Sequence, residues 1–120
     1  MPSLAFTTFY ASEAITSTTA DVGADIVYTV PAQHDGQITL LMAANGGSTH
    51  VVSVQVYHAD TATYSFLLRS KAVGTGEAYN VLGSSRLYLH AGDKILAYKS
   101  AGTLDVSISG KQFYNPSRRV

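Results

Sequence analysis

The chain contains no cysteine and no tryptophan among its 120 residues. Without cysteine there is no disulfide framework, no thiolate ligand for a metal ion and no cysteine nucleophile. Three common ways of stabilising a small protein or making it catalytic are thereby excluded. Folding has to rest on side-chain packing and on hydrogen bonds between strands.

Charge is also in short supply. Asp, Glu, Lys and Arg together make up 13% of the residues, roughly half of their share in an average soluble domain. Eight basic and eight acidic side chains give a net charge of zero, which removes the main electrostatic reason to expect a nucleic acid or an anionic membrane as partner. Because hydrophobic residues reach 46%, the composition favours a folded protein whose weakly polar surface packs against other protein chains.

Long hydrophobic runs are missing as well. The longest, Ile38 to Ala44, includes a threonine and is far shorter than the roughly twenty residues that span a bilayer. The first residues have neither the basic start nor the continuous apolar stretch of a secretory signal. We expect no membrane-spanning segment, and synthesis in the cytoplasm.

What the sequence does contain is apolar residues at every second position. This alternation runs through residues 26–30, 38–42, 52–56 and 104–108, with Gly, Pro, Asp and Asn between the segments. A period of two is typical of strands that bury one face. Helix signals are nearly missing, although Ser12–Ile15 could form one helical turn. The sequence therefore predicts an all-β fold, an antiparallel β-sandwich of the jelly-roll kind with about eight short strands over residues 23–110.

The same alternation predicts individual faces and turns. It places Ile38, Leu40 and Met42 on one face of a strand that follows a turn at Asp35-Gly36. It also pairs residues 52–56 with residues 64–68 in a hairpin. Gly110 is predicted to end the last strand.

Two terminal segments fall outside the regular pattern. Residues 1–22 are predicted to be an N-terminal arm or an edge strand, and residues 111–120 a C-terminal tail. Extended arms that carry aromatic side chains could dock onto neighbouring subunits, whereas an ordinary edge strand and a frayed tail would not. The candidate interface residues in these segments are Phe6, Phe9, Tyr10, Phe113, Tyr114, Arg118 and Arg119.

The search for reactive residues finds no catalytic, cofactor-binding or metal-binding set. The four histidines, at positions 34, 50, 58 and 90, match no familiar ligand spacing. The acidic residues are scattered and do not alternate as in a calcium loop, and Asp93 is predicted to be a turn residue. We therefore expect no enzyme activity, no cofactor and no metal.

Tyrosine, in contrast, occurs eight times. It is common in strands, in subunit interfaces and on sugar-binding surfaces, so all three roles remain open. Tyr57, together with Gln55 and Ser53, lies opposite the valine face of residues 52–56. Tyr57 and Gln55 are therefore the candidates for a surface contact in the middle of the chain.

Four segments carry a resemblance to a known family. They are Asp25-Ile26-Val27-Tyr28-Thr29-Val30-Pro31-Ala32, an apolar strand ending in Ala44-Asn45, Leu89-His90-Ala91-Gly92-Asp93-Lys94-Ile95, and Leu104-Asp105-Val106-Ser107-Ile108-Ser109-Gly110. Together they resemble small structural proteins of tailed-phage particles. Gln33-His34-Asp35 stands before Gly36, where that family usually continues directly with glycine. The resemblance implies a β-sandwich structural protein of a virion and carries over no catalytic residue.

Composition and resemblance together favour a capsid decoration (cement) protein, which binds the assembled shell and stabilises contacts between capsomers. The expected partners are the major capsid protein or other virion proteins, and further copies of this chain in a homotrimer, since shells offer threefold positions. The expected location is the capsid surface of the virion, after synthesis in the host cytoplasm. The alternatives are a neck or tail accessory protein, a host-glycan-binding module of the virion, and an enzyme built around His58 or His90.

Overall fold

The computed structural model describes residues 6–46 and 50–115. Within them the chain forms nine β-strands and one short 3-10 turn. The strands are β1 (Phe6–Ile15), β2 (Asp25–Thr29), β3 (His34–Asn45), β4 (His50–His58), β5 (Thr63–Val73), β6 (Ala78–Asn80), β7 (Leu87–His90), β8 (Lys94–Lys99) and β9 (Leu104–Tyr114), and the turn η1 spans Asp21–Gly23. The predicted all-β fold is confirmed.

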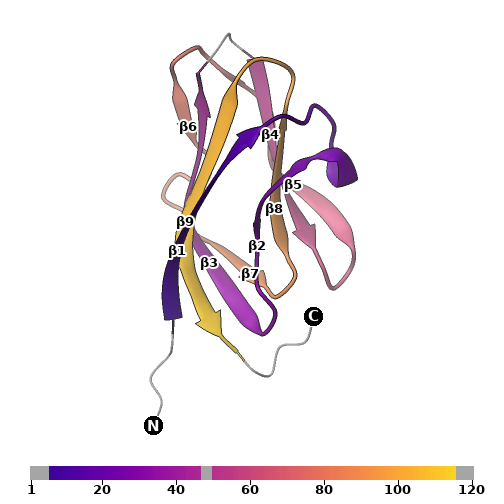
Figure 1. The fold of residues 1–120 in the computed structure, drawn as a ribbon, viewed down its shortest axis with the longest axis vertical. Coiled ribbons are helices and arrows are strands. Elements are labelled where there is room, and N and C mark those ends of the chain that lie inside the picture. Colours follow the sequence, from indigo (N-terminus) through magenta and orange to yellow (C-terminus); the bar gives the residue numbers. More distant parts are fainter. Residues whose placement is uncertain (1–5, 47–49, 116–120) are drawn as a thin grey trace.

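The strands build two antiparallel sheets that pack face to face (Figure 1). Sheet A has the order β1-β9-β3-β6, with β7 also paired to β3, and sheet B has the order β2-β8-β4-β5. Because β6 and β7 pair with successive parts of β3, they act as one interrupted strand. Counted in this way, eight strands wind between the two sheets as in a jelly roll.

The core lies between the sheets and consists of aliphatic side chains that alternate along the strands. Both sheets contribute, and the ladder between β4 and β5 confirms the predicted hairpin. The core residues with no exposed surface are Ile38, Leu41, Ala43, Val52, Val54, Ile95, Ala97, Val106 and Ile108.

Strand β3 changes the face that it buries halfway along its length. A bulge at Thr39 shifts the register with β9 between Ile38 and Leu40. Ile38 and Leu41 are consequently buried, while Leu40 and Met42 point outward. The prediction that Ile38, Leu40 and Met42 share one face is wrong, because one extra residue reverses the direction of every side chain beyond it.

Gly110 lies opposite this bulge, and it does not end the last strand as predicted. Strand β9 continues to Tyr114, so residues 111–114 belong to the sandwich and not to a separate tail. A Cβ at position 110 would overlap the carbonyl oxygen of Gln37. Glycine is therefore required here because the backbones of β9 and β3 approach each other closely.

Asp35 and Gly36 also lie inside a strand, where the sequence predicts a turn. The chain reverses earlier, at Gln33, whose φ of 61° lies in the left-handed region. The N–H of His34 donates to the carbonyl of Pro31 at 3.2 Å and closes this reversal. Asp35 is thereby placed at the end of sheet A, next to β7 and β9.

Residues 6–15 form β1, the edge strand of sheet A, which decides between the two alternatives for this part of the chain. The possible helical turn at Ser12–Ile15 is the last part of this strand. Strand β1 pairs with β9 along its whole length without a register shift. It is thus a regular strand of the sandwich and not an arm.

The aromatic pair Phe9 and Tyr28 ties β1 to β2 in the other sheet. The two rings stack with their centroids 4.3 Å apart and their planes within 2° of parallel. The hydroxyl of Tyr28 accepts a hydrogen bond from Nε2 of Gln112 at 2.7 Å, and burial raises the pKa of this hydroxyl. Phe9 is therefore a packing residue in the described chain.

After β1 the chain crosses to sheet B and lays residues 16–24 along it. The carboxylate of Asp25 accepts hydrogen bonds from the backbone N–H groups of Thr16 at 2.6 Å and Ser17 at 3.1 Å. These bonds, that from Thr16 above all, hold the pKa of Asp25 below its ordinary value of 3.8. The N–H of Lys99 in β8 also donates to the carbonyl of Ser17 at 3.0 Å, so the start of the segment is fixed to sheet B.

Candidate functional site

Residues 16–24 cover the middle of the outer face of sheet B, whereas Ile26, Val51 and Phe66 on the same face remain exposed. Gln55 and Leu96 point away from the core, yet they are only 1% and 3% exposed. The N–H of Asp21 donates to Oε1 of Gln55 at 2.8 Å, and Nε2 of Gln55 donates to the Asp21 carboxylate at 2.7 Å. The prediction that Gln55 lies on an accessible surface is wrong, because these two bonds allow its amide to be buried.

Tyr57, the other candidate on β4, is half-buried at the end of the strand. Its ring lies 4.9 Å from the ring of Tyr64, and Nζ of Lys94 lies 5.3 Å from its centroid. Ser53 is buried and accepts a hydrogen bond from the N–H of Ser70 at 2.9 Å. Of the three residues opposite the valine face, Tyr57 alone keeps substantial exposed surface.

The outer face of sheet A has no comparable cover from the described residues. We call it the open face, and its members point away from the core on four strands: Phe6, Thr8, Tyr10 and Ser12 on β1; Asp105, Ser107, Ser109, Lys111 and Phe113 on β9; Leu40 and Met42 on β3; and Tyr88 on β7. Tyr10 and Tyr88, near its two edges, are 69% and 67% exposed. Asp105 and Lys111 are the charged members of this set, and the register adds Asp35 opposite Phe113, so the open face carries few charges among its aromatic and hydroxyl side chains.

Aromatic side chains gather at one end of the open face, where β1 begins and β9 ends. The rings of Phe6 and Phe113 lie 5.8 Å apart, and Nζ of Lys111 lies 4.9 Å from the Phe6 ring. On the other side of β9, Tyr114 meets the ring of His34 edge-on at 5.6 Å. The pairing of β1 with β9 thus brings together predicted interface residues from the two ends of the chain.

The remaining predicted residues are placed differently. Tyr10 stands on the open face farther along β1, where its hydroxyl donates to Oγ of Ser107 at 3.3 Å. Phe9 points into the sandwich and packs against its core. Arg118 and Arg119 lie outside the described residues.

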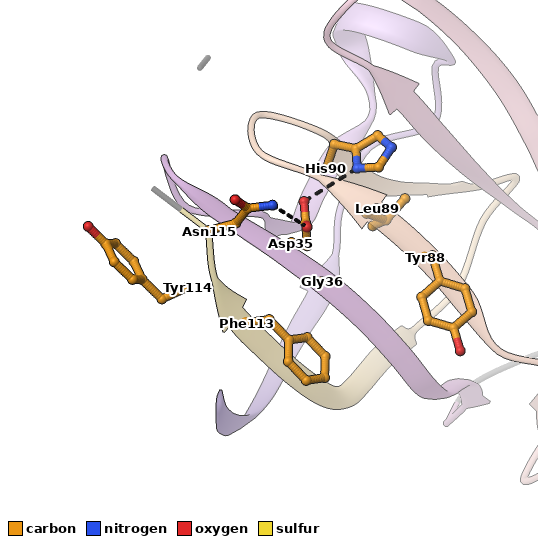
Figure 2. A pocket seen from close by; sticks show the side chains of 8 residues that line it. All are labelled: Asp35, Gly36, Tyr88, Leu89, His90, Phe113, Tyr114 and Asn115. Atoms are coloured by element: carbon orange, nitrogen blue, oxygen red, sulfur yellow. Dashed lines mark hydrogen bonds and ion pairs between the residues drawn. The ribbon is translucent and has the colours of Figure 1, made fainter. Parts of the chain in front are cut away.

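A cleft opens beside the aromatic end, between the start of β3, the strand β7 and the end of β9 (Figure 2). Its volume is about 510 Å³, within the usual range for small-ligand sites. The register of sheet A explains it, since Asp35 lies on β3 directly between His90 of β7 and Phe113 of β9. The lining residues are Asp35, Gly36, Tyr88, Leu89, His90, Phe113, Tyr114 and Asn115.

The polar groups of the cleft converge on the Asp35 carboxylate. Nδ1 of His90 lies 3.4 Å from Oδ1, and Nδ2 of Asn115 donates to Oδ2 at 3.1 Å. Figure 2 shows the rings of Tyr88 and Phe113 on one side of this polar group, with Tyr114 turned away from them. The cleft therefore presents aromatic rings next to a carboxylate, an imidazole and an amide.

The turn after β7 fixes the position of His90. The carboxylate of Asp93 accepts hydrogen bonds from the N–H of His90 and from the N–H of Ala59, both at 2.9 Å. The N–H of Asp93 also donates to the His90 carbonyl at 3.0 Å and closes the turn. The prediction that Asp93 is a turn residue is confirmed, and its buried carboxylate in addition links β7 to the end of β4.

This arrangement suits binding better than covalent chemistry. A His90–Asp35 pair supplies two members of a hydrolytic triad, but the described lining includes no serine, threonine or cysteine as nucleophile. A polyhydroxylated ligand fits the groups that are present, because its C–H faces can lie on aromatic rings while its hydroxyls bond to carboxylate and amide groups.

His34 and His58 do not line the cleft, although His34 touches Tyr114 at its margin. Nε2 of His58 lies 2.8 Å from Oγ of Ser65, and Nδ1 of His34 lies 2.9 Å from the carbonyl oxygen of Ala32. Within residues 6–46 and 50–115, no three His, Asp or Glu side chains come together closely enough to hold a metal ion. In the same part of the chain, no helix has the length and apolar character needed to cross a membrane.

Sequence reasoning missed several residues of the open face and the cleft. It placed Asp35 and His90 in or near turns and assigned no surface role to Tyr88 or Leu40. Tyr88 stands between Leu87 and Leu89, so the period of two could have assigned it to an outer face. Leu40 carries no such signal, because the bulge that turns it outward is not visible in the pattern.

Comparison of the sequence with models of known protein families and with curated proteins finds no match.

Proposed function

We propose that this protein is a structural subunit of a tailed-phage particle, a capsid decoration protein that binds the assembled shell through the open face of sheet A. The observation that carries the proposal is the open face, a whole side of the sandwich with little charge and with exposed Phe6, Tyr10, Leu40 and Tyr88. Protein interfaces are depleted in charged residues and enriched in aromatic ones. The resemblance of segments within residues 25–110 to small virion proteins supports the phage assignment.

The extensive pairing of strands in sheet A suits binding to an assembled shell. The open face rests on β9 and β3, which pair with each other over most of their length, so binding orders few groups that were not ordered before. A protein that binds only the assembled shell stabilises it by mass action. The partners would be the major capsid protein or other virion proteins at the capsid surface, after synthesis in the host cytoplasm.

The copy number and position of the protein in purified particles test this proposal. A decoration protein is expected at many equivalent positions of the lattice, which quantitative mass spectrometry and a particle reconstruction would reveal. A handful of copies at the neck or tail would contradict the decoration role and favour an accessory role there.

The cleft favours a second candidate function, recognition of host glycans at the neck or tail. The carrying observation is the set of aromatic rings next to Asp35, His90 and Asn115. Titration with neutral oligosaccharides, followed by NMR, would test it with Tyr88→Ala. Tyr10→Ala is the matched control, since Tyr10 is equally exposed but does not line the cleft. Loss of binding in both variants, or no binding by the unaltered chain, would contradict this function.

A further inference from the structure

The edge strands of the two sheets differ in how well they are protected against pairing with another strand. Exposed backbone N–H and C=O groups at a sheet edge invite such pairing, and short strands, bulges and charged side chains prevent it. Strands β6 and β7 are only three and four residues long, and β2 has five residues and a register shift. Strand β5 is long, but it carries Arg69 and Lys71, two register shifts and Ser70 at a φ of 53°.

Strand β1 has few of these protections, and its one charged residue, Glu13, pairs with core residue Val106 near the end of the strand. It is ten residues long, contains no proline and keeps its register with β9 throughout. Within the described part of the chain, residues 6–15 make no backbone hydrogen bond other than those of the ladder with β9. In an antiparallel strand every second residue directs its N–H and C=O away from the partner, so β1 offers a regular row of donors and acceptors.

We propose that β1 pairs antiparallel with β1 of a second copy of this chain, so that the two A sheets continue into one sheet across a twofold axis. A second copy is the occupant that the strand fits, because an antiparallel pair of identical strands is self-complementary. The net charge of zero places no long-range repulsion between copies. This inference concerns self-association alone, and it holds whatever the open face binds.

The side chains of β1 select one register for this pairing. With Tyr10 opposite Tyr10 of the second copy, residues 6–14 are paired, and Ile15, where the chain leaves for sheet B, stays outside. Opposite residues share a face of the sheet. In this register apolar side chains lie opposite apolar ones, and polar side chains lie opposite polar ones. The pairs are Phe6 with Ala14, Thr7 with Glu13, Thr8 with Ser12, and Phe9 with Ala11.

The neighbouring register is less favourable. Centred on Ala11, it would place Glu13 opposite Phe9 and so set a carboxylate beside an aromatic ring that packs towards the core. It would also pair Ile15, whose side chain is already buried in its own subunit. The contact is isologous and closes with two copies, so it predicts a dimer in place of the trimer expected from the resemblance.

Disulfide trapping tests both the contact and its register. Because the full chain contains no cysteine, Tyr10→Cys introduces a single thiol, which the proposed register places opposite its own copy at a separation that a disulfide can span. Tyr88→Cys is the matched control. Tyr88 is also an exposed tyrosine on sheet A with one hydroxyl hydrogen bond, but it lies on β7 at the opposite edge.

Under mild oxidation we expect Tyr10→Cys to form covalent dimers roughly ten-fold faster than Tyr88→Cys or more, because pairing raises the effective concentration of the thiol. Equal rates for the two variants would overturn the proposal. Sedimentation of the unaltered chain should give a monomer–dimer equilibrium. A monomer at every concentration, or a trimer, would also overturn it.

A pair of charge variants provides a second measurement. The variant Thr8→Lys/Ser12→Lys places lysine opposite lysine twice in the proposed register, whereas Thr8→Lys/Ser12→Glu places lysine opposite glutamate twice. We expect the first to dimerise about ten-fold more weakly than the second at low salt, since charges directly opposite each other interact across a ladder. The same dimer affinity in both variants would show that the register is wrong. Circular dichroism melting confirms that each variant is folded.

Discussion

The two sheets contribute to one core, yet a segment of the chain crosses the outer face of sheet B alone. Sheet B carries residues 16–24 on its outside, and Gln55 beneath them is 1% exposed. Sheet A leaves Tyr10 and Tyr88 about two-thirds exposed, with Leu40 between their strands. The middle of one outer face is thus covered by the chain itself, while Ile26, Val51 and Phe66 stay exposed around it, and the other face has no such segment across it.

The difference arises from a connection and not from the strands themselves. Gln55 and Gln37 are both glutamines at outward positions on central strands. Gln55 is bonded to Asp21 of the covering segment, whereas Nε2 of Gln37 donates to the hydroxyl of exposed Tyr88 at 3.1 Å. Both amides are buried, but Gln55 is 1% exposed beneath a crossing segment, whereas Gln37 is 9% exposed and its amide bonds to a side chain of its own sheet.

The two glutamines provide the variant with the largest expected effect. Gln55→Ala removes both hydrogen bonds to Asp21 and leaves a gap beneath the covering segment, so we expect the free energy of unfolding to fall by about 2 kcal/mol. Gln37→Ala is the matched control on sheet A, where one hydrogen bond, to the exposed Tyr88, is lost in place of two, and it should cost about 1 kcal/mol. Urea unfolding of both variants measures the difference, and equal losses would break the comparison between the sheets.

The attachment of the covering segment predicts an intermediate, pH-dependent effect. Asp25→Asn replaces the acceptor of the Thr16 and Ser17 N–H groups, and after allowance for solvent screening it should lower the free energy of unfolding by about 1 kcal/mol at neutral pH. The folded pKa of Asp25 lies below its ordinary value of 3.8, so this contribution is fully present above that value. It is lost as the pH falls from there through the folded pKa.

Unfolding experiments from neutral pH down to about pH 2 measure this effect. The unaltered chain should converge with Asp25→Asn at the acid end. A constant difference between the two at all pH values would show that the hydrogen bonds of the carboxylate are not what fixes the segment. The hydrogen-exchange protection factors of residues 16–24, which correct for the pH dependence of intrinsic exchange, should fall in the same pH range, while those of β9 should not.

The smallest effect on stability is expected on the open face. Leu40 is 37% exposed, so Leu40→Lys should change the free energy of unfolding by no more than about 0.5 kcal/mol. If the open face binds the shell, however, the added charge should weaken binding to particles that lack the protein. Ile26→Lys is the matched control, because Ile26 is a similarly exposed aliphatic residue on sheet B. Equal binding by both variants would contradict the role of the open face.

Much of the fold could be predicted because alternation is a local property. Val52, Val54 and Val56 are buried as their pattern predicts, and so are Leu104, Val106 and Ile108. In strand β3 the alternation of apolar and polar residues does not predict which side chains are buried. Its single bulge at Thr39 moves Leu40 and Met42 to the opposite face, and no local signal announces an extra residue whose place depends on the partner strand.

The candidate site was predicted only in part. Phe6, Tyr10 and Tyr114 are exposed and Phe113 is half-buried, whereas Phe9 between them packs against the core. The prediction that Gln55 is accessible was wrong because Asp21, in the segment that covers Gln55, lies 34 residues away in the sequence. Proximity of that kind is set by the winding of the chain between the sheets, which alternation does not encode.

By itself the sequence determined that this protein is an all-β sandwich with little charge and without cysteine chemistry, since composition and a period of two suffice for that. The tertiary structure decided everything that depends on distant residues. It placed Asp35 between His90 and Phe113, joined residues 6–15 to residues 104–113 in the β1–β9 ladder, and laid a segment over the middle of one outer face and not over the other. The physical reason is that strand periodicity fixes which way a side chain points, whereas exposure depends on what the rest of the chain lays over it.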